Sequence, residues 1–156
     1  MIKMDKLLSK NDYERAKYLY TIAVALEDRL DPKFEKFILM STKFIKLYAE
    51  DVIGNRWPEG ERAILKILKS NNYNQDAIHY AVYYAIDILK DRWPEIEPYI
   101  VKDSEHLKSY LEFINNKGYK IIVTVQYDDL IDHLERADKL PISTRIYKVE
   151  GNGEVS

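Results

Sequence analysis

The sequence predicts a mainly α-helical fold, in which stacked helix-turn-helix repeats precede a small C-terminal strand-helix-strand (α+β) appendage. The first observation is a repeat, because Arg-Trp-Pro-Glu occurs at residues 56–59 and again at residues 92–95. The second is the helical period of the apolar residues before each copy. The third is a change after Gly118, where β-branched residues become frequent. Self-similarity of helical segments at this spacing is typical of stacked repeat proteins.

Length and composition fit one folded domain with a small addition. The chain has 156 residues, of which 46% are hydrophobic and 32% are charged, a balance found in folded rather than disordered proteins. We predict a helical repeat region over residues 1–117 and a small β-α-β unit packed on it over residues 118–150. Residues 151–156 are predicted to form a disordered tail.

Charge and cysteine content narrow the functional classes. The chain carries 24 basic and 26 acidic residues, for a net charge of −2, which argues against a dedicated nucleic-acid binder. It has no cysteine, so disulfides and thiol catalysis are excluded. The N-terminus does not resemble a signal peptide, and no run of about 18 apolar residues is present. We therefore expect a cytoplasmic protein without a membrane partner.

The helix before each Arg-Trp-Pro-Glu segment has a clear apolar face. Tyr48, Val52 and Ile53 stand at positions i, i+4 and i+5, and the second copy repeats this pattern from Tyr84 onward. A small alanine follows each of the two tyrosines and would permit a close neighbour. Gly54 is suited to the C′ position that ends the first of these helices.

A sharp corner is expected where each tryptophan precedes its proline. The residue before proline is pushed toward an extended conformation, and the proline itself suits the first position of the next helix. An ion pair across each corner is predicted between the arginine and the second glutamate. The predicted corner residues are Arg56, Trp57, Pro58, Glu61, Arg92, Trp93, Pro94 and Glu97.

A fainter copy lies upstream, at Arg29-Leu30-Asp31-Pro32 followed by Glu35 and Ile38. We interpret it as the same corner with one extra residue after the proline. In the last copy, Pro98 removes an N–H from the new helix, so this helix is expected to be short or irregular.

The remaining elements follow from period and capping residues. We predict helices at 58–69 and 75–90, separated by a polar break at 70–74. Upstream, residues 39–42 are either a break with Ser41 as the N-cap or part of one unbroken helix over 33–53. Asp103 or Ser104 is expected to cap the last repeat helix, which ends near Gly118. A strand at 119–125, a helix at 128–138 and a strand at 143–149 complete the chain.

The repeated pattern resembles the short α-helical repeat found in many uncharacterised proteins of tailed bacteriophages. The match covers roughly residues 44–114 and centres on the Arg-Trp-Pro-Glu core, with a degenerate copy before it. The resemblance implies stacked helix pairs, a phage origin and a place in the host-cell cytoplasm. It implies no catalytic residues.

No residue set in the sequence has the spacing of a catalytic, cofactor or metal site. His79, His106 and His133 are evenly spaced, but they form no HxxxH or HExxH unit. Asp128 and Asp129 precede a predicted helix, where capping explains them. Glu59 and Glu61 lie in a predicted first turn, where they complement the helix dipole. We expect no cofactor, no metal and no catalytic residue.

Aromatic residues supply the candidates for a partner-binding surface. Tyr80 and Tyr83 lie on one predicted helix beside His79, and could either contact a partner or pack in the core. Trp57 and Trp93 could stack with their arginines on the surface, since arginine and tryptophan are frequent in hot spots. The competing interpretation, that both tryptophans build the structural corner, is favoured by their recurrence in the repeat.

Three functional classes remain from the sequence. The leading hypothesis is a non-catalytic protein-interaction module of phage origin that acts as an adaptor or inhibitor of a host protein. The alternative is a nucleic-acid-binding protein, which the near-neutral charge disfavours. The third is a small enzyme with a site between the helical and C-terminal parts. A homodimer is compatible with an exposed C-terminal strand edge.

Overall fold

The protein is mainly α-helical, as the sequence predicts. The computed structural model describes residues 2–70, 73–125 and 145–150. The chain divides into two compact units, Met1–Lys90 and Asp91–Ser156. The predicted segments 1–117, 118–150 and 151–156 stay a prediction. Among the described residues, no helix is long and apolar enough to cross a membrane.

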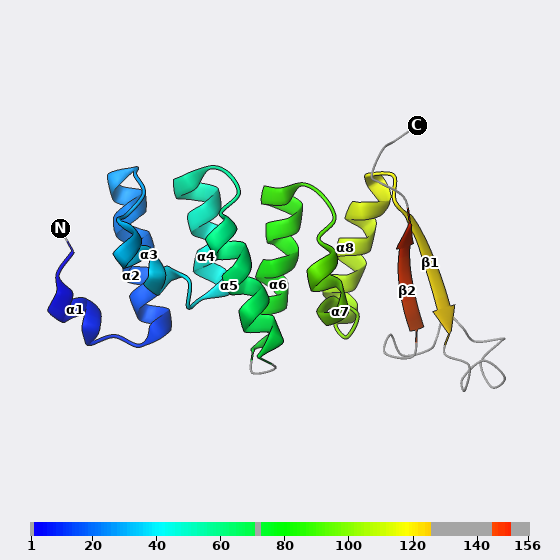
Figure 1. Ribbon diagram of the computed structural model, residues 1–156, viewed down its shortest axis with the longest axis horizontal. Coiled ribbons are helices and arrows are strands. Elements are labelled where there is room, and N and C mark those ends of the chain that lie inside the picture. The colour runs from blue at the N-terminus through cyan, green and yellow to red at the C-terminus, as the bar shows by residue number, and fades with distance from the viewer. Residues whose placement is uncertain (1, 71–72, 126–144, 151–156) are drawn as a thin grey trace. The chain divides into compact units, whose positions relative to one another are not determined.

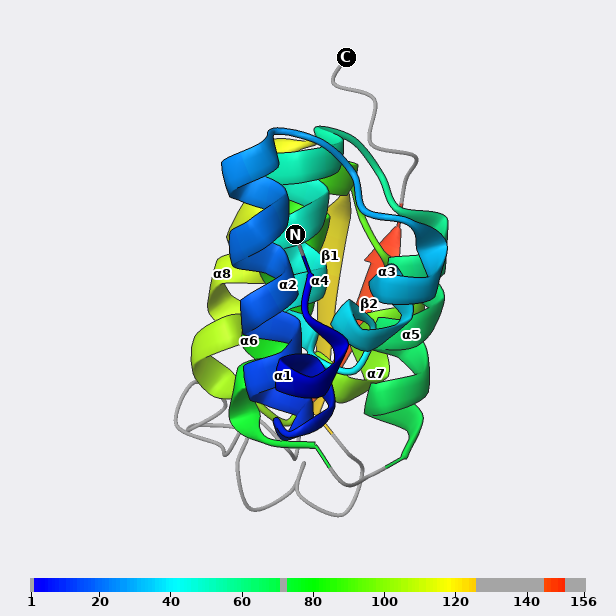
Figure 2. The same ribbon diagram turned by 90° about the vertical axis from the view of Figure 1, so that its left-hand side faces the viewer.

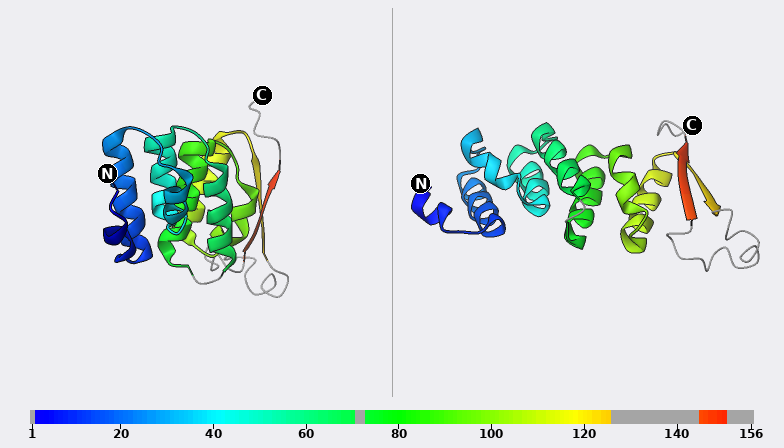
Figure 3. Two further views of the ribbon diagram at one scale, coloured as in Figure 1. Left: turned by 60° about the vertical axis from the view of Figure 1, so that its left-hand side comes forward. Right: turned by 60° about the horizontal axis from the view of Figure 1, so that its bottom comes forward.

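The described residues of the first unit form six α-helices, two of which continue into a π-helical turn. In chain order they are α1 (Met4–Leu8), α2 (Asp12–Leu26), α3 (Pro32–Ile38), α4 (Thr42–Tyr48) with η1 (Ala49–Ile53), α5 (Pro58–Lys69) and α6 (Gln75–Tyr84) with η2 (Ala85–Leu89). Within this unit α4 packs on both α2 and α6. These three helices form one layer, and α3 and α5 form a second layer beside it (Figures 1 and 2). Two further views show the same pairing of layers (Figure 3).

The core of the first unit follows the helical period. Ala16, Leu19 and Ala23 of α2 are completely buried, at positions i, i+3 and i+7. The small residues Ala49 and Ala85 are also completely buried. Their helices η1 and η2 touch each other, so the small side chains lie where neighbouring helices come close.

Most of the predicted helix boundaries are confirmed. The predicted helix 58–69 is α5, and the predicted helix 75–90 is α6 with η2. The break near residues 39–42 is present, and the Ser41 side chain accepts a hydrogen bond from the Phe44 N–H. The alternative of one unbroken helix over 33–53 is therefore wrong, because Ser41 is extended and starts a new helix.

The two π-turns are a feature that the sequence pattern did not predict. Gly54 N–H donates to the Ala49 carbonyl at 2.8 Å, and Lys90 N–H donates to the Ala85 carbonyl at 2.7 Å. These hydrogen bonds span five residues instead of four, and they widen the last turn of each helix as a π-bulge does.

The second unit has short helices and a pair of strands. After η3 (Pro94–Ile96) and α7 (Glu97–Ile100) comes α8 (Ser104–Asn116). The expected irregularity around Pro98 is confirmed by the 3₁₀ turn and the four-residue helix. The Asp103 side chain caps α8 by accepting the His106 N–H at 3.1 Å.

Strands β1 (Lys120–Val125) and β2 (Arg145–Glu150) pair antiparallel, with Lys120 opposite Glu150 and Val125 opposite Arg145. The predicted helix 128–138 lies outside the described residues. The strand-helix-strand appendage as a whole therefore stays a prediction, as does the tail at 151–156.

Substitution of Gly60 by alanine is expected to destabilise the protein by about 1–2 kcal/mol. A Cβ atom here would lie 2.7 Å from Ile45 Cγ2 and 2.7 Å from Trp57 Cε3. This overlap outweighs the gain of up to about 1 kcal/mol that alanine brings to a helix interior. Urea unfolding followed by circular dichroism measures the change. A variant more stable than the parent would show that the Trp57 ring moves aside at little cost.

Candidate functional site

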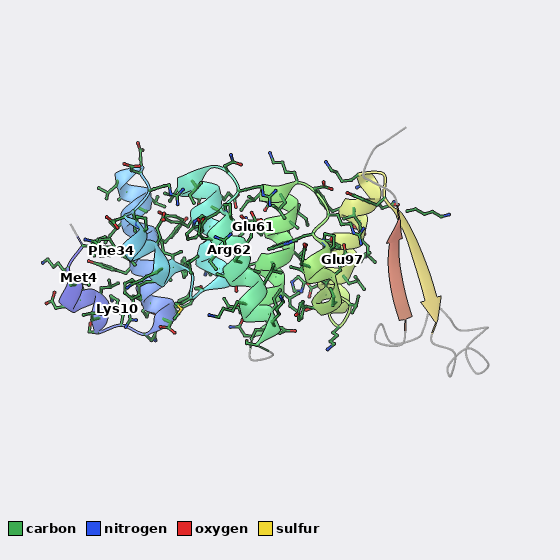
Figure 4. All side chains as sticks on the ribbon, in the orientation of Figure 1. Met4, Lys10, Phe34, Glu61, Arg62 and Glu97 are labelled. Atoms are coloured by element: carbon green, nitrogen blue, oxygen red, sulfur yellow. The ribbon has the colours of Figure 1, made fainter. Side chains whose placement is uncertain are left out.

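The sequence-predicted ion pair of the second corner is present and bidentate. We call residues 55–61 the second corner. Arg56 Nε donates to Glu61 Oε2 at 3.1 Å, and Arg56 Nη2 donates to Glu61 Oε1 at 2.6 Å. Glu61, labelled in Figure 4, is only 9% exposed. Two parallel bonds from a planar guanidinium hold this carboxylate in one orientation.

Tyr84, the last residue of α6, completes this corner. The Tyr84 hydroxyl donates to Glu61 Oε2 at 2.9 Å and accepts the Trp57 N–H at 2.8 Å. Trp57 is extended, with φ −124° and ψ 91°, so its N–H has no helical acceptor. One hydroxyl thus satisfies both a buried carboxylate and a buried backbone donor.

The third corner, residues 91–97 of the second unit, repeats this geometry. Arg92 donates to Glu97 through Nε at 2.7 Å and Nη2 at 2.8 Å. The Tyr110 hydroxyl donates to Glu97 Oε2 at 2.6 Å and accepts the Trp93 N–H at 2.9 Å. Both predicted ion pairs are therefore confirmed.

The faint upstream copy forms the same network, and we call residues 28–35 the first corner. Arg29 donates to Glu35 at 3.1 Å and 3.0 Å. The Tyr48 hydroxyl donates to Glu35 and accepts the Leu30 N–H.

The sequence interpretation places the extra residue of this first corner after the proline, but the extra residue precedes the proline. Pro32 and Glu35 keep the three-residue spacing of Pro58 and Glu61, whereas Arg29 and Pro32 are one residue further apart than Arg56 and Pro58. The additional residue is Asp31, whose side chain caps α3 by accepting the Lys33 N–H at 3.0 Å. The buried Leu30, whose N–H binds the Tyr48 hydroxyl, stands where the second corner has Trp57.

Each corner opens with a short polar side chain that folds onto the following arginine. The Asp28, Asn55 and Asp91 Oδ1 atoms accept the N–H of Arg29, Arg56 and Arg92 at 2.8, 2.7 and 2.7 Å. This contact satisfies the arginine N–H just after the left-handed residue that ends each helix.

Burial raises the pKa of Tyr48, Tyr84 and Tyr110 above the usual value, and hydrogen bonds to the corner glutamates add to the effect. Burial, followed by the contact with Asp51, raises the pKa of Tyr20 to about 12. In the unfolded chain these tyrosines ionise near pH 10. Because the folded pKa values are higher, their contribution to stability is complete below about pH 10 and is lost as the pH rises further.

We therefore expect the free energy of unfolding to fall above about pH 10, while the corner tyrosines of the folded chain stay protonated. Absorbance of tyrosinate near 295 nm, compared between native and urea-unfolded protein, measures this. Replacement of Tyr84 by phenylalanine removes one of these tyrosines and should make the fall in stability above pH 10 smaller. Equal tyrosinate in both states at pH 11 would contradict the assigned burial.

The two indoles are buried in their corners. Trp57 is 1% exposed and Trp93 is 6% exposed, so their surfaces are taken up inside the corners. Tyr80 and Tyr83 are half-buried on α6, and the His79 ring lies 4.8 Å from each of their rings. The partner-binding role predicted for the tyrosines stays a prediction.

The histidines and acids considered from the sequence lie in separate surroundings. His106 Nδ1 lies 2.9 Å from an Asp103 oxygen, and Glu59 is exposed and lies 3.7 Å from Arg62. Within the described part of the chain, no three histidine, aspartate or glutamate side chains are grouped as metal ligands. His133, Asp128 and Asp129 lie outside the described residues.

A groove of about 310 Å³ lies in the first unit at the first turns of α2, α4 and α6. Tyr13 and Met40, which line it, are 44% and 58% exposed. Lys43 donates to the Tyr13 hydroxyl at 3.2 Å and lies over the rings of Tyr13 and Phe44. The groove therefore combines exposed apolar surface with a cation that is already held by an aromatic ring.

Exposed charges of the first unit separate by layer. Helices α3 and α5 carry five exposed basic residues and one exposed acidic residue. The basic residues are Lys33, Lys36, Arg62, Lys66 and Lys69, and the acidic residue is Glu59. Helices α2, α4 and α6, with their π-turns, carry one exposed basic residue, Lys17, and six exposed acidic residues. The acidic residues are Asp12, Glu14, Glu50, Asp51, Asp76 and Asp87. A net charge near zero thus conceals two layers of opposite sign.

A scan of protein-family models, a search of curated proteins and a search of solved structures each find no match to the chain. The resemblance to the phage repeat stays a prediction that rests on residues 44–114 alone.

Proposed function

We propose that the chain is a non-catalytic protein-interaction module, made of stacked helix-turn-helix repeats, that acts as an adaptor or inhibitor of a host protein in a phage context. The observation that carries the proposal is the repeated corner. Its arginine, glutamate and tyrosine have the chemistry of a reactive site, yet the arginine and the tyrosine are both bonded to the glutamate. Such groups build a scaffold, and repeat scaffolds present extended surfaces to partners.

Exposed apolar side chains support the same proposal. Six large ones are more than two-fifths exposed in the first unit: Met4, Leu8, Tyr13, Val24, Leu26 and Met40. Tyrosine and methionine are enriched at protein interfaces. The groove that Tyr13 and Met40 line offers a place for a partner side chain. The host cytoplasm is the compartment that this proposal requires.

The test is affinity capture with the tagged full chain from a bacterial lysate, treated with nuclease and read by mass spectrometry. The expected result is one near-stoichiometric protein whose complex re-forms from purified components. Loss of every captured species on nuclease treatment would instead support the nucleic-acid alternative. Turnover of a substrate that one point substitution abolishes would overturn the non-catalytic assignment.

A further inference from the structure

Five exposed basic side chains gather on α3 and α5 of the first unit. Arg62 is one of them and lies 3.7 Å from the exposed Glu59. Lys66 and Lys69 stand at the end of α5, and Arg62 lies one turn earlier on the same exposed face. The rise of a helix places Arg62 and Lys69 about 10 Å apart along the axis. Arg62 follows Glu61 in the sequence, and both are labelled in Figure 4. Glu61 is buried and Arg62 is exposed, so α5 changes from corner to exposed face within one residue.

The neighbouring helix α3 adds two lysines to this face. Lys33 Nζ lies 5.1 Å from the Phe34 ring centroid, and Lys36 Nζ lies 5.1 Å from the Phe37 ring centroid. The acids of α3 and α5 offset few of these charges, because Glu35 and Glu61 are buried against Arg29 and Arg56, which leaves Glu59 as the exposed acid of these two helices. The helix dipole favours basic residues only in the last turn, so it does not explain Lys33 or Arg62.

Four of the six exposed acids of the other layer, Asp12, Glu50, Asp51 and Asp87, have partners within the unit. Lys46 is buried and pairs with both Glu50 and Asp87, the latter at 3.0 Å. Asp51 accepts the Tyr20 hydroxyl, and Asp12 lies 3.7 Å from Arg15. A second copy of the chain would therefore meet acids that already have partners, which makes it a poorer complement than an acidic surface of another protein.

We propose that the basic face of α3 and α5, formed by Lys33, Lys36, Arg62, Lys66 and Lys69, binds an acidic surface of a partner protein. The inference rests on the proposed function and adds the chemical class of the partner. Nucleic acid fits less well, because a nucleic-acid binder normally carries a surplus of basic residues, whereas this chain has a net charge of −2. Charge complementarity of this kind governs encounter and specificity.

The test uses the full chain and a fluorescein-labelled peptide of alternating glutamate and alanine, followed by fluorescence anisotropy at about 0.05 M salt. Binding is expected, with an affinity that falls about tenfold in K66E/K69E, and by less in the neutral variant K66Q/K69Q. The matched control K17E/K108E makes the same change in net charge on exposed lysines elsewhere, and should alter the affinity by less than about twofold.

Several outcomes would overturn the proposal. They are an equal loss in K66E/K69E and K17E/K108E, no binding of the peptide by the parent chain, and tighter binding of duplex DNA than of the peptide. Concentration-dependent self-association that K66E/K69E abolishes would assign the face to a second copy instead. Circular dichroism shows whether each variant is folded. If K66E/K69E is unfolded, the neutral variant K66Q/K69Q still tests the proposal.

Affinity capture from lysate separates this inference from the proposed function. If the parent chain and K66E/K69E retain the same stoichiometric protein, the interaction function stands and the basic face is not its site. If the parent chain captures no protein, the function itself fails, whatever the peptide result.

Discussion

Replacement of Glu61 by alanine is expected to lower the free energy of unfolding by about 2–3 kcal/mol. The carboxylate accepts two bonds from Arg56 and one from the Tyr84 hydroxyl. Loss of a buried partner typically costs about 3–5 kcal/mol when the remaining charge stays buried. Arg56 is 60% exposed, so water can solvate its guanidinium after the substitution. The cost is therefore below that range and arises mainly from the Tyr84 hydroxyl and the lost bidentate pair.

Glu59 supplies the matched control for this prediction. It lies in the same first turn of α5, but its side chain is exposed and 3.7 Å from Arg62. Glu59→Ala should change stability by less than about 0.5 kcal/mol. Urea unfolding of both variants and the parent gives the comparison. Equal effects of the two substitutions would mean that the corner network contributes no more than an exposed glutamate.

A double-mutant cycle separates the tyrosine contact from the ion pair. Tyr84→Phe removes the hydroxyl that joins Glu61 to the Trp57 N–H. Because Tyr84 and Glu61 are in contact, their effects should be non-additive, with a coupling free energy of about 1 kcal/mol or more. Additive effects would show that the two contacts act independently.

The local parts of the corner could be predicted from the sequence. Pro58 at the first helical position, Trp57 in an extended conformation and the Arg56–Glu61 pair depend on residues within one turn of each other. Their signals are therefore contained in a short segment. The same holds for Ser41 and Asp103, whose side chains cap helices that begin at the next residue.

The tyrosine that completes each corner could not be assigned in this way. Tyr84 lies 27 residues from Trp57, and Tyr110 lies 17 residues from Trp93. These contacts depend on how one helix packs beside another. The only signal in the sequence was the recurrence of Tyr48 and Tyr84 in the aligned copies, and Tyr110 does not follow that spacing.

The separation of charges by layer was also hidden in the sequence. Basic and acidic residues are interspersed along the chain, so the net charge of −2 suggests no charged surface. Arg62, Lys66 and Lys69 stand at i, i+4 and i+7, a spacing that places them on one helical face. Only the packing of α3 and α5 on the same side of the other layer joins this row to Lys33 and Lys36 (Figure 2).

Replacement of Trp57 by alanine is expected to have the largest effect, a loss of about 3–5 kcal/mol in the free energy of unfolding. The indole is 1% exposed, and its ring centroid lies 5.0 Å from that of Tyr48. Ile45 and Gly60 surround the same space, so the cavity left by alanine would not collapse easily. Trp57 Nε1 is buried and has no hydrogen-bond acceptor among the described residues.

The indole therefore stabilises the corner through apolar packing, and phenylalanine should retain much of its contribution. We expect Trp57→Phe to cost less than about 1.5 kcal/mol, since no hydrogen bond is lost and only part of the volume is removed. Trp93 remains as the fluorescent reporter in both variants, and urea unfolding gives the two free energies. A phenylalanine variant as unstable as the alanine variant would contradict this account. It would show that a hydrogen bond from Nε1, and not the apolar packing of the ring, stabilises the corner.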